Sequence, residues 1–178
     1  MAPVITYVKQ TWVDNNVSNP VSAARLGVIE EGILDASQAP AVRVFHNTTQ
    51  SATSGVALAL AFNSERIDQA AGAASTMHDT VTNNSRLTAI YAGVYAIYAT
   101  VEWAASPVNA TIRFRIGGAT EIARQQFVGD YRVMNLSHIY AFAVNDYVEC
   151  VVSQASGGAL NVNSTANYSP EFGMVRVG

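Results

Sequence analysis

One segment near the middle of the chain constrains the fold more than any other, residues 92–103, which read AGVYAIYATVEW. From Tyr95 to Trp103 the odd positions carry Tyr, Ile, Ala, Val and Trp, while the even positions carry Ala, Tyr, Thr and Glu. A period of two with β-branched and aromatic residues is typical of a strand that packs one face against a core. Gly93 stands where the chain enters this strand, as a bend or a close backbone approach would require. We expect this segment to be the central strand of a β-sandwich.

Shorter strand patterns lie on both sides of this segment and are separated by turn residues. In one of them Ile112, Phe114 and Ile116 alternate with two arginines, and Gly117-Gly118 then favours a hairpin turn. Residues 136–144 and 147–153 are expected to pair through a turn at 145–146, whereas 63–82 shows no clear pattern. Further strands are expected at 41–45, 55–62, 86–90 and 172–177.

Many short strands with frequent turns and almost no helix predict an all-β fold, an antiparallel jelly-roll sandwich. We assign residues 41–178 to this knob domain. Its expected core positions are Val44, Leu58, Leu60, Ile97, Val101, Trp103, Ile112, Phe114, Val148 and Val152.

The first 40 residues have a different character and contain the clearest helix signal of the chain. Ser18 or Asn19 can cap a helix, and Pro20 suits its first position. An apolar seam with spacings of four, three and four follows, so these side chains share one narrow helix face: Ser22, Leu26, Ile29 and Ile33. So short a helix needs a partner surface, on its own domain or on another protein. We therefore assign residues 1–40 to an N-terminal helical extension that serves as an anchor.

Composition argues against several classes of function. The net charge is −3 and Lys9 is the only lysine, so the basic patch of a nucleic-acid-binding protein is missing. Apolar residues are evenly spread, which predicts no membrane insertion. The N-terminus lacks the charged and apolar regions of a signal peptide, which favours synthesis in a reducing cytosol. Cys150 alternates with Val148 and Val152, so we expect a buried structural thiol.

No catalytic or metal-binding motif joins the polar residues. The three histidines lie far apart in sequence, without the spacing of a metal site, and no GxSxG elbow is present. We therefore expect no enzyme activity and no cofactor. Three acidic residues could contribute to a calcium site with loop carbonyls, although turn and surface roles are the default. The candidates considered are His46, His78 and His138 for metal or catalysis, and Asp130, Asp146 and Glu171 for calcium.

Four short motifs in the knob resemble the globular heads of complement's first component and the tumour-necrosis-factor-like jelly rolls. They read VRVFHN at 42–47, AGVY at 92–95, NDYVE at 145–149 and YSPEF at 168–172. The family usually has Gly before the Asp of the third motif, where this chain has Asn145, and it often carries a collagen stalk, absent here. The resemblance implies the jelly-roll fold and a tight homotrimer.

The N-terminal extension is similar to a segment that recurs in structural proteins of tailed bacteriophages, especially minor tail and fibre-like proteins. The motifs are TWVD at 11–14, NPVSAARL at 19–26 and IEEGI at 29–33, with Gly27 where that family usually has Asn. In such proteins the segment precedes a variable C-terminal knob. The resemblance implies that the extension binds phage capsid or tail proteins, through Trp12, Leu26, Ile29 and Ile33.

Together these patterns predict a bacteriophage virion protein made in the host bacterial cytoplasm, a homotrimeric knob on the particle surface. It would serve as capsid decoration, a head fibre or a tail-fibre knob. A host-attachment role, with a host surface glycan or receptor as partner, is the first alternative. A secreted signalling ligand of the tumour-necrosis-factor kind is the second.

Overall fold

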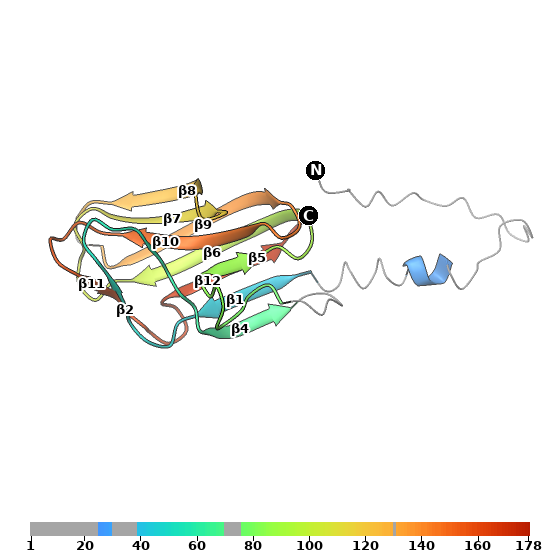
Figure 1. The fold of residues 1–178 in the computed structure, drawn as a ribbon, viewed down its shortest axis with the longest axis horizontal. Helices are drawn as coiled ribbons and strands as arrows, with labels where there is room; N and C mark the ends of the chain where they lie inside the picture. The colour runs from blue at the N-terminus through green and yellow to red at the C-terminus, as the bar shows by residue number, and fades with distance from the viewer. Residues whose placement is uncertain (1–24, 30–38, 70–75, 130) are drawn as a thin grey trace, which may run out of the picture.

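The computed structural model describes residues 25–29, 39–69, 76–129 and 131–178. From residue 39 onward they form a sandwich of antiparallel strands, which confirms the predicted all-β jelly roll (Figure 1). The strands are β1 (Ala41–Phe45), β2 (Gln50–Ala52), β3 (Leu58–Ala59), β4 (Ser64–Gln69), β5 (Arg86–Thr88), β6 (Gly93–Glu102), β7 (Ala110–Ile116), β8 (Thr120–Phe127), β9 (Val133–Phe142), β10 (Tyr147–Ser153), β11 (Leu160–Val162) and β12 (Glu171–Arg176).

Two larger sheets face each other, and a small β2–β11 ladder is added. The first sheet has the order β4-β1-β12-β6-β9, and the second has the order β3-β10-β7-β8 with β5 also paired to β10. The two ends of the knob meet at one end of the sandwich, because the N–H of Arg176 donates to the carbonyl of Pro40 and that of Val94 to the carbonyl of Gly178. Figure 1 shows the chain entering β1 at this end.

The core lies between the two sheets and is filled by aromatic and aliphatic side chains from both. The rings of Phe62 and Phe114 lie against Phe172, with centroid distances of 5.5 and 5.7 Å. Trp103 is fully buried, and its indole N–H donates to the sulfur of Met134 at 3.2 Å. All the predicted core positions are buried except Leu58, which is half-buried. The inward face of the 92–103 segment was therefore predicted correctly.

Gly93 is buried at the close approach that its position suggested. A Cβ atom built there would lie 2.5 Å from the carbonyl oxygen of Gly178 and from Nε of Arg176. Gly173 is under the same constraint on β12, where a Cβ would run into the ring of Tyr98. Both glycines let neighbouring groups sit directly on the backbone of the first sheet.

Three predictions about strands were wrong. The strand β6 is not central, because β12 occupies the middle of the first sheet. The strands β9 and β10 do not pair with each other but lie in opposite sheets, so the 145–146 turn crosses the sandwich. At 55–62 the strand contains Leu58 and Ala59 only, since the side chain of Gln50 takes both backbone hydrogen bonds of Ala61.

The structure also contains a strand, β4, within the 63–82 segment, where no clear pattern was found. Its residues SERIDQ are mostly polar because β4 is the edge strand of the first sheet and is largely exposed.

The helical part of the extension is described at residues 25–29, where both Leu26 and Ile29 are exposed. Trp12, Ser22 and Ile33 lie outside the described residues. Among the described residues, no helix has the length and hydropathy needed to cross a bilayer.

Candidate functional site

The outward side of the first sheet carries exposed apolar side chains on its β12, β6 and β9 half. Ile139 on β9 is 64% exposed, and Val177, just after β12, is 58% exposed. Valine and tyrosine side chains extend the surface along the same strands, and we call the whole set the apolar face: Val94, Tyr98, Ile139 and Val177. Scattered apolar residues are normal on a protein surface, but a contiguous group of this kind marks an interaction site.

The strand register makes the apolar face continuous. Ala96 on β6 lies opposite Ile139 on β9 and opposite Val175 on β12, so these side chains form a row across three strands. Val94 lies opposite Ala141 in the next row, and the N–H of Val177 donates to the carbonyl of Val94. Directly opposed side chains on one face of an antiparallel sheet are neighbours in space.

A cluster of ion pairs borders the apolar face on the β1 and β4 side. The carboxylate of Glu171 is buried and accepts from Nε of Arg43 at 2.7 Å and from Nε of Arg66 at 2.6 Å. The guanidinium of Arg66 also lies 4.2 Å from the ring centroid of Phe45. Two charge-assisted hydrogen bonds hold this carboxylate, so Glu171, one of the calcium candidates, stands in an ion-pair cluster. Burial raises the pKa of neighbouring Tyr98, so its phenol stays protonated at neutral pH.

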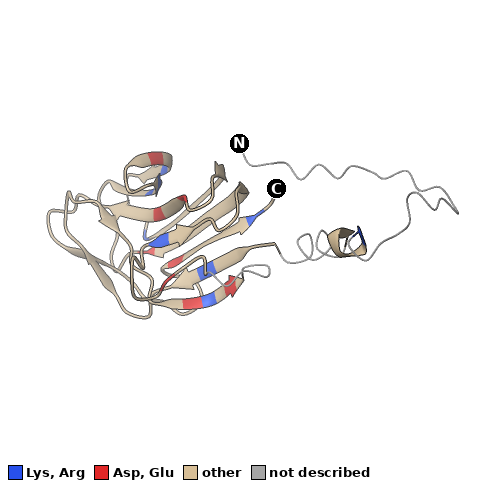
Figure 2. Ribbon diagram, turned by 45° about the vertical axis from the view of Figure 1, so that its right-hand side comes forward, with Lys and Arg blue, Asp and Glu red and all other residues tan. Residues whose placement is uncertain are grey.

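The outward side of the second sheet is charged instead. Glu149 on β10 is buried between Arg86 on β5 and Arg115 on β7, at N–O distances of 3.8 and 3.9 Å. Arg113 on β7 pairs with Glu121 on β8 at 3.5 Å. By contrast, β6 and β9 carry Glu102 as their single charged residue. Figure 2 marks the charged residues along the ribbon, those of β1 and β4 in the first sheet included. The outward side of the second sheet is thus charged, whereas that of the first sheet is charged on its β1 and β4 half and apolar on its β6 and β9 half, which suits association.

The candidate metal and catalytic residues do not come together. His46 contacts Thr48 locally, while His138 lies opposite Ile97 on the half-buried, core-facing side of β9. His78 is buried and bonds to Glu65 and to a backbone carbonyl. Within the described residues there is no group of three His, Cys, Asp or Glu that could hold a metal ion.

The remaining candidates have structural surroundings. The Asp146 carboxylate accepts from the N–H of Ala143 at 2.8 Å and stabilises the turn before β10. Asn145 in that turn has a φ of 68°, a left-handed conformation that Asn tolerates in place of the usual Gly. Cys150 is fully buried, and burial raises the pKa of its thiol far above the ordinary value, so it is no nucleophile at neutral pH. Asp130 lies outside the described residues.

The apolar face was missed by the sequence reasoning, although a signal for it exists. The even positions Val94, Ala96 and Tyr98 are apolar as well, so the start of β6 has no polar side. A strand that is apolar on both sides is typical of one that is covered on both sides.

Comparison with solved structures places the fold. Murine APRIL at pH 8.0 is similar with a TM-score of 0.59 and 9% identity, over 79% of this chain and all of that one. A second murine APRIL structure, at pH 5.0, gives a TM-score of 0.57 with the same identity and coverage. Eiger TNF from S. frugiperda is similar with a TM-score of 0.54 and 12% identity, over 79% of this chain and 94% of that one. The knob has the tumour-necrosis-factor-like jelly-roll fold. No family model matches the sequence, and no curated protein matches it either.

Proposed function

We propose that this chain is a structural knob that assembles into a homotrimer through the apolar face. The observation that carries the proposal is the exposed row on β12, β6 and β9, beside a second sheet whose outward side is charged. Complete burial of a fully exposed Ile or Val side chain contributes about 1.5–3 kcal/mol. The side chains of the apolar face are partly exposed, so each contributes a fraction of that amount, and each subunit offers several. Threefold symmetry rests on the resemblance to complement heads and tumour-necrosis-factor-like jelly rolls. No catalytic role is part of the proposal.

A charge in the middle of the apolar face tests this assembly. Ile139→Asp places a carboxylate where the interface excludes water, so the variant should be a folded monomer. Val108→Asp is the matched control, because Val108 is 52% exposed and lies in the loop before β7, away from the apolar face. Sedimentation velocity gives the mass, and far-UV circular dichroism verifies the fold. A trimeric Ile139→Asp protein would contradict the proposal.

We further propose that residues 1–40 attach the knob to a bacteriophage particle, as a capsid decoration or a tail-fibre knob. The support is the resemblance of 11–33 to phage structural proteins, together with the exposure of Leu26 and Ile29. Three copies held by one trimer would raise the local concentration of their anchors into the millimolar range.

The test replaces Leu26 and Ile29 by Asp in the phage that encodes the chain. The knob should keep its oligomeric state, while the protein should be lost from purified virions. Incorporation at the unmodified level would contradict the anchor and leave the knob untouched.

A signalling ligand is the second candidate function, favoured by the fold shared with APRIL and Eiger. The genes beside the coding sequence discriminate between the two. Capsid, portal or tail genes support the virion protein, and their absence supports the ligand.

A further inference from the structure

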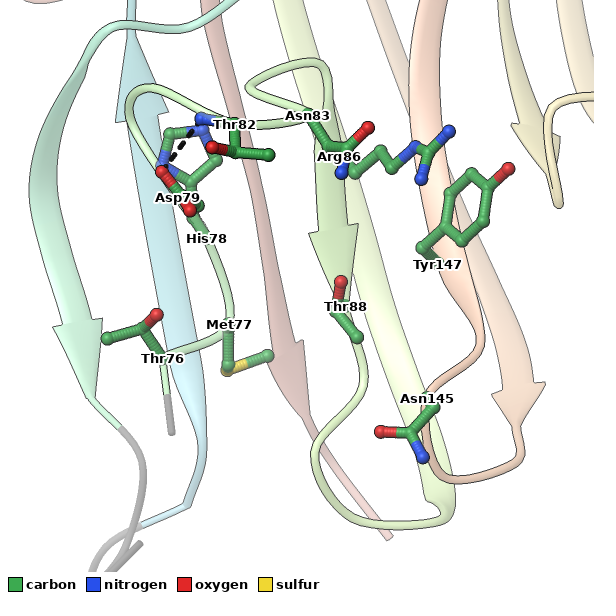
Figure 3. A pocket seen from close by; sticks show the side chains of 10 residues that line it. All are labelled: Thr76, Met77, His78, Asp79, Thr82, Asn83, Arg86, Thr88, Asn145 and Tyr147. Atoms are coloured by element: carbon green, nitrogen blue, oxygen red, sulfur yellow. Dashed lines mark hydrogen bonds between the residues drawn. The ribbon is translucent and has the colours of Figure 1, made fainter. Parts of the chain in front are cut away.

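A polar pocket of about 320 Å³ lies at the edge of the sandwich, between the loop that precedes β5 and the start of β10 (Figure 3). The loop 76–85 forms one wall, and β5 with the start of β10 forms the other. This volume is at the lower end of the range that small-molecule sites occupy. The pocket shares no residue with the apolar face, so it is a separate site.

Hydrogen bonds to β4 hold the loop that forms one wall of the pocket. The carboxylate of Asp68 on β4 accepts from the N–H groups of Met77 and His78, at 3.1 and 3.2 Å. The buried His78 ring bonds to Glu65 at 3.0 Å and to the carbonyl of Asn84 at 3.2 Å. The loop is therefore bound to the sandwich through backbone and side-chain hydrogen bonds. Its pocket-lining groups are held in place before any ligand binds.

The opposite wall carries the guanidinium group of Arg86, which can donate further hydrogen bonds. Arg86 lies 4.1 Å from the ring centroid of Tyr147, which fixes the plane of its head group. Its Nε is buried and lies 3.8 Å from Glu149, too far for a hydrogen bond, so the terminal N–H groups of the guanidinium are the donors that a ligand can reach. The nearer oxygen of Glu149 accepts from Ser85 at 2.8 Å instead.

The rim carries further polar groups that have no partner within the described part of the chain. Oδ1 of Asp79 accepts from the N–H groups of Val81 and Thr82, whereas Oδ2 makes no hydrogen bond there. The side chains of Asn83 and Asn145 make none to other described residues either. Amide, carboxylate and guanidinium groups thus line one pocket, with Asp79 and Arg86 on opposite sides of it and Asn145 at its far end (Figure 3).

The geometry points to a sugar ring as the ligand of this pocket, bound as the terminal unit of a glycan. Each hydroxyl of a sugar both donates and accepts, which matches a lining with donors on Arg86 and the Asn amides and acceptors on Asp79 and the same amides. The lining carries one carboxylate, that of Asp79, against one guanidinium, that of Arg86, so the site does not favour an inorganic anion. An apolar peptide side chain would leave these polar groups unpaired.

Two asparagines of the rim can be replaced by glycine without a change in backbone conformation. Asn83 and Asn145 have φ values of 55° and 68°, which glycine adopts without strain, so Asn→Gly removes the amide and keeps the backbone. Asn109→Gly is the matched control, since Asn109 has a φ of 46° and lies outside the pocket. Arg86→Met removes the guanidinium while retaining apolar bulk over Tyr147.

The full-length protein is first applied to a printed array of bacterial and animal glycans. The monosaccharide that ends the bound glycans is then titrated by saturation-transfer NMR. We expect Asn83→Gly, Asn145→Gly and Arg86→Met each to weaken binding by about tenfold or more, and Asn109→Gly to bind like the unmodified protein.

An array without binding, or Asn83→Gly and Arg86→Met proteins that bind normally, would overturn the inference. Displacement of the sugar by inorganic phosphate would do so in favour of an anion site. The mass of each protein is measured in parallel, because a monomer that binds sugar contradicts the assembly alone, and a trimer that binds none contradicts the pocket alone.

Discussion

At the scale of single residues, the first sheet depends on two places where a side chain would not fit. Gly173 is one of them, because the Tyr98 ring lies directly on it and completes the apolar face. A residue with a side chain at this point would separate the ring from β12. The apolar face and the packing of the sheet therefore depend on the same glycine.

Gly173→Ala is expected to lower the free energy of unfolding by about 1–3 kcal/mol, because the added methyl group displaces the Tyr98 ring. Gly158→Ala is the matched control, since no atom lies within 4 Å of its Cβ position, and it should change stability by less than about 0.5 kcal/mol. Urea denaturation at one fixed protein concentration measures both. Equal stability of the two variants would contradict the contact.

Trp103→Ala should cost about 3–5 kcal/mol, because the fully buried indole leaves a cavity and an unpaired Met134 sulfur. Tyr131→Ala, at a residue that is 57% exposed, serves as the control. Thermal melting measures the difference in stability between the two variants. An unchanged melting temperature for Trp103→Ala would mean that the inward face of β6 is assigned incorrectly.

At the scale of elements, the end of β6 is tied to the turn before β12 by one carboxylate. Oε2 of Glu102 accepts from the hydroxyl of Thr165 at 2.6 Å. Hydrogen bonds from Thr165 and Tyr168 hold the pKa of Glu102 below its ordinary value, and the Arg132 guanidinium adds a smaller effect in the same direction. The ionised carboxylate therefore stabilises the folded state.

This contribution has a defined pH dependence. Because the folded pKa is the lower one, the stabilisation is present above the ordinary value of 4.5 and is lost as the pH falls through the folded pKa. The melting temperature should fall more steeply between pH 6 and pH 3 for the unmodified protein than for Glu102→Gln. Glu121→Gln, which loses the exposed pair with Arg113, should keep the steep slope. Parallel curves for the unmodified protein and Glu102→Gln would refute this role.

Elements with one buried side were predictable, and those defined by long-range pairing were not. Alternation located β1 and β10 with the observed bounds and identified the inward side of β6. The same alternation fits a strand in either sheet, so the separation of β9 from β10 was not visible in the sequence. The Gln50 side chain that ends β3 comes from elsewhere in the chain, where no local pattern reveals it.

The apolar face and the pocket differ in how well the sequence predicts them. The apolar face has a local signal, because Val94, Ala96 and Tyr98 make both sides of β6 apolar. The pocket has none, since its walls come from 76–88 and 145–147, which the fold alone brings together. Its polar residues are of kinds that are common in turns, and their sequence spacing gives no hint of a common space.

At the scale of the whole molecule, the knob is one domain, and the outward sides of its two sheets differ in the residues that they present. The outward side of the second sheet carries ion pairs, while that of the first carries the apolar face beside the ion pairs of Glu171. In the proposed trimer another subunit covers the apolar face. The two ends of the knob lie together at one end of the sandwich, away from the middle of either outward face (Figure 1).

The most direct test of this account is the mass of the unmodified full-length protein at micromolar concentration, measured by sedimentation equilibrium. One chain has a mass of 18.9 kDa, so the predicted trimer, three times 18.9 kDa, has a mass of about 57 kDa. We expect that species to persist on dilution, because several buried apolar side chains per subunit hold it together. A single species of 18.9 kDa over the same concentration range would contradict the account.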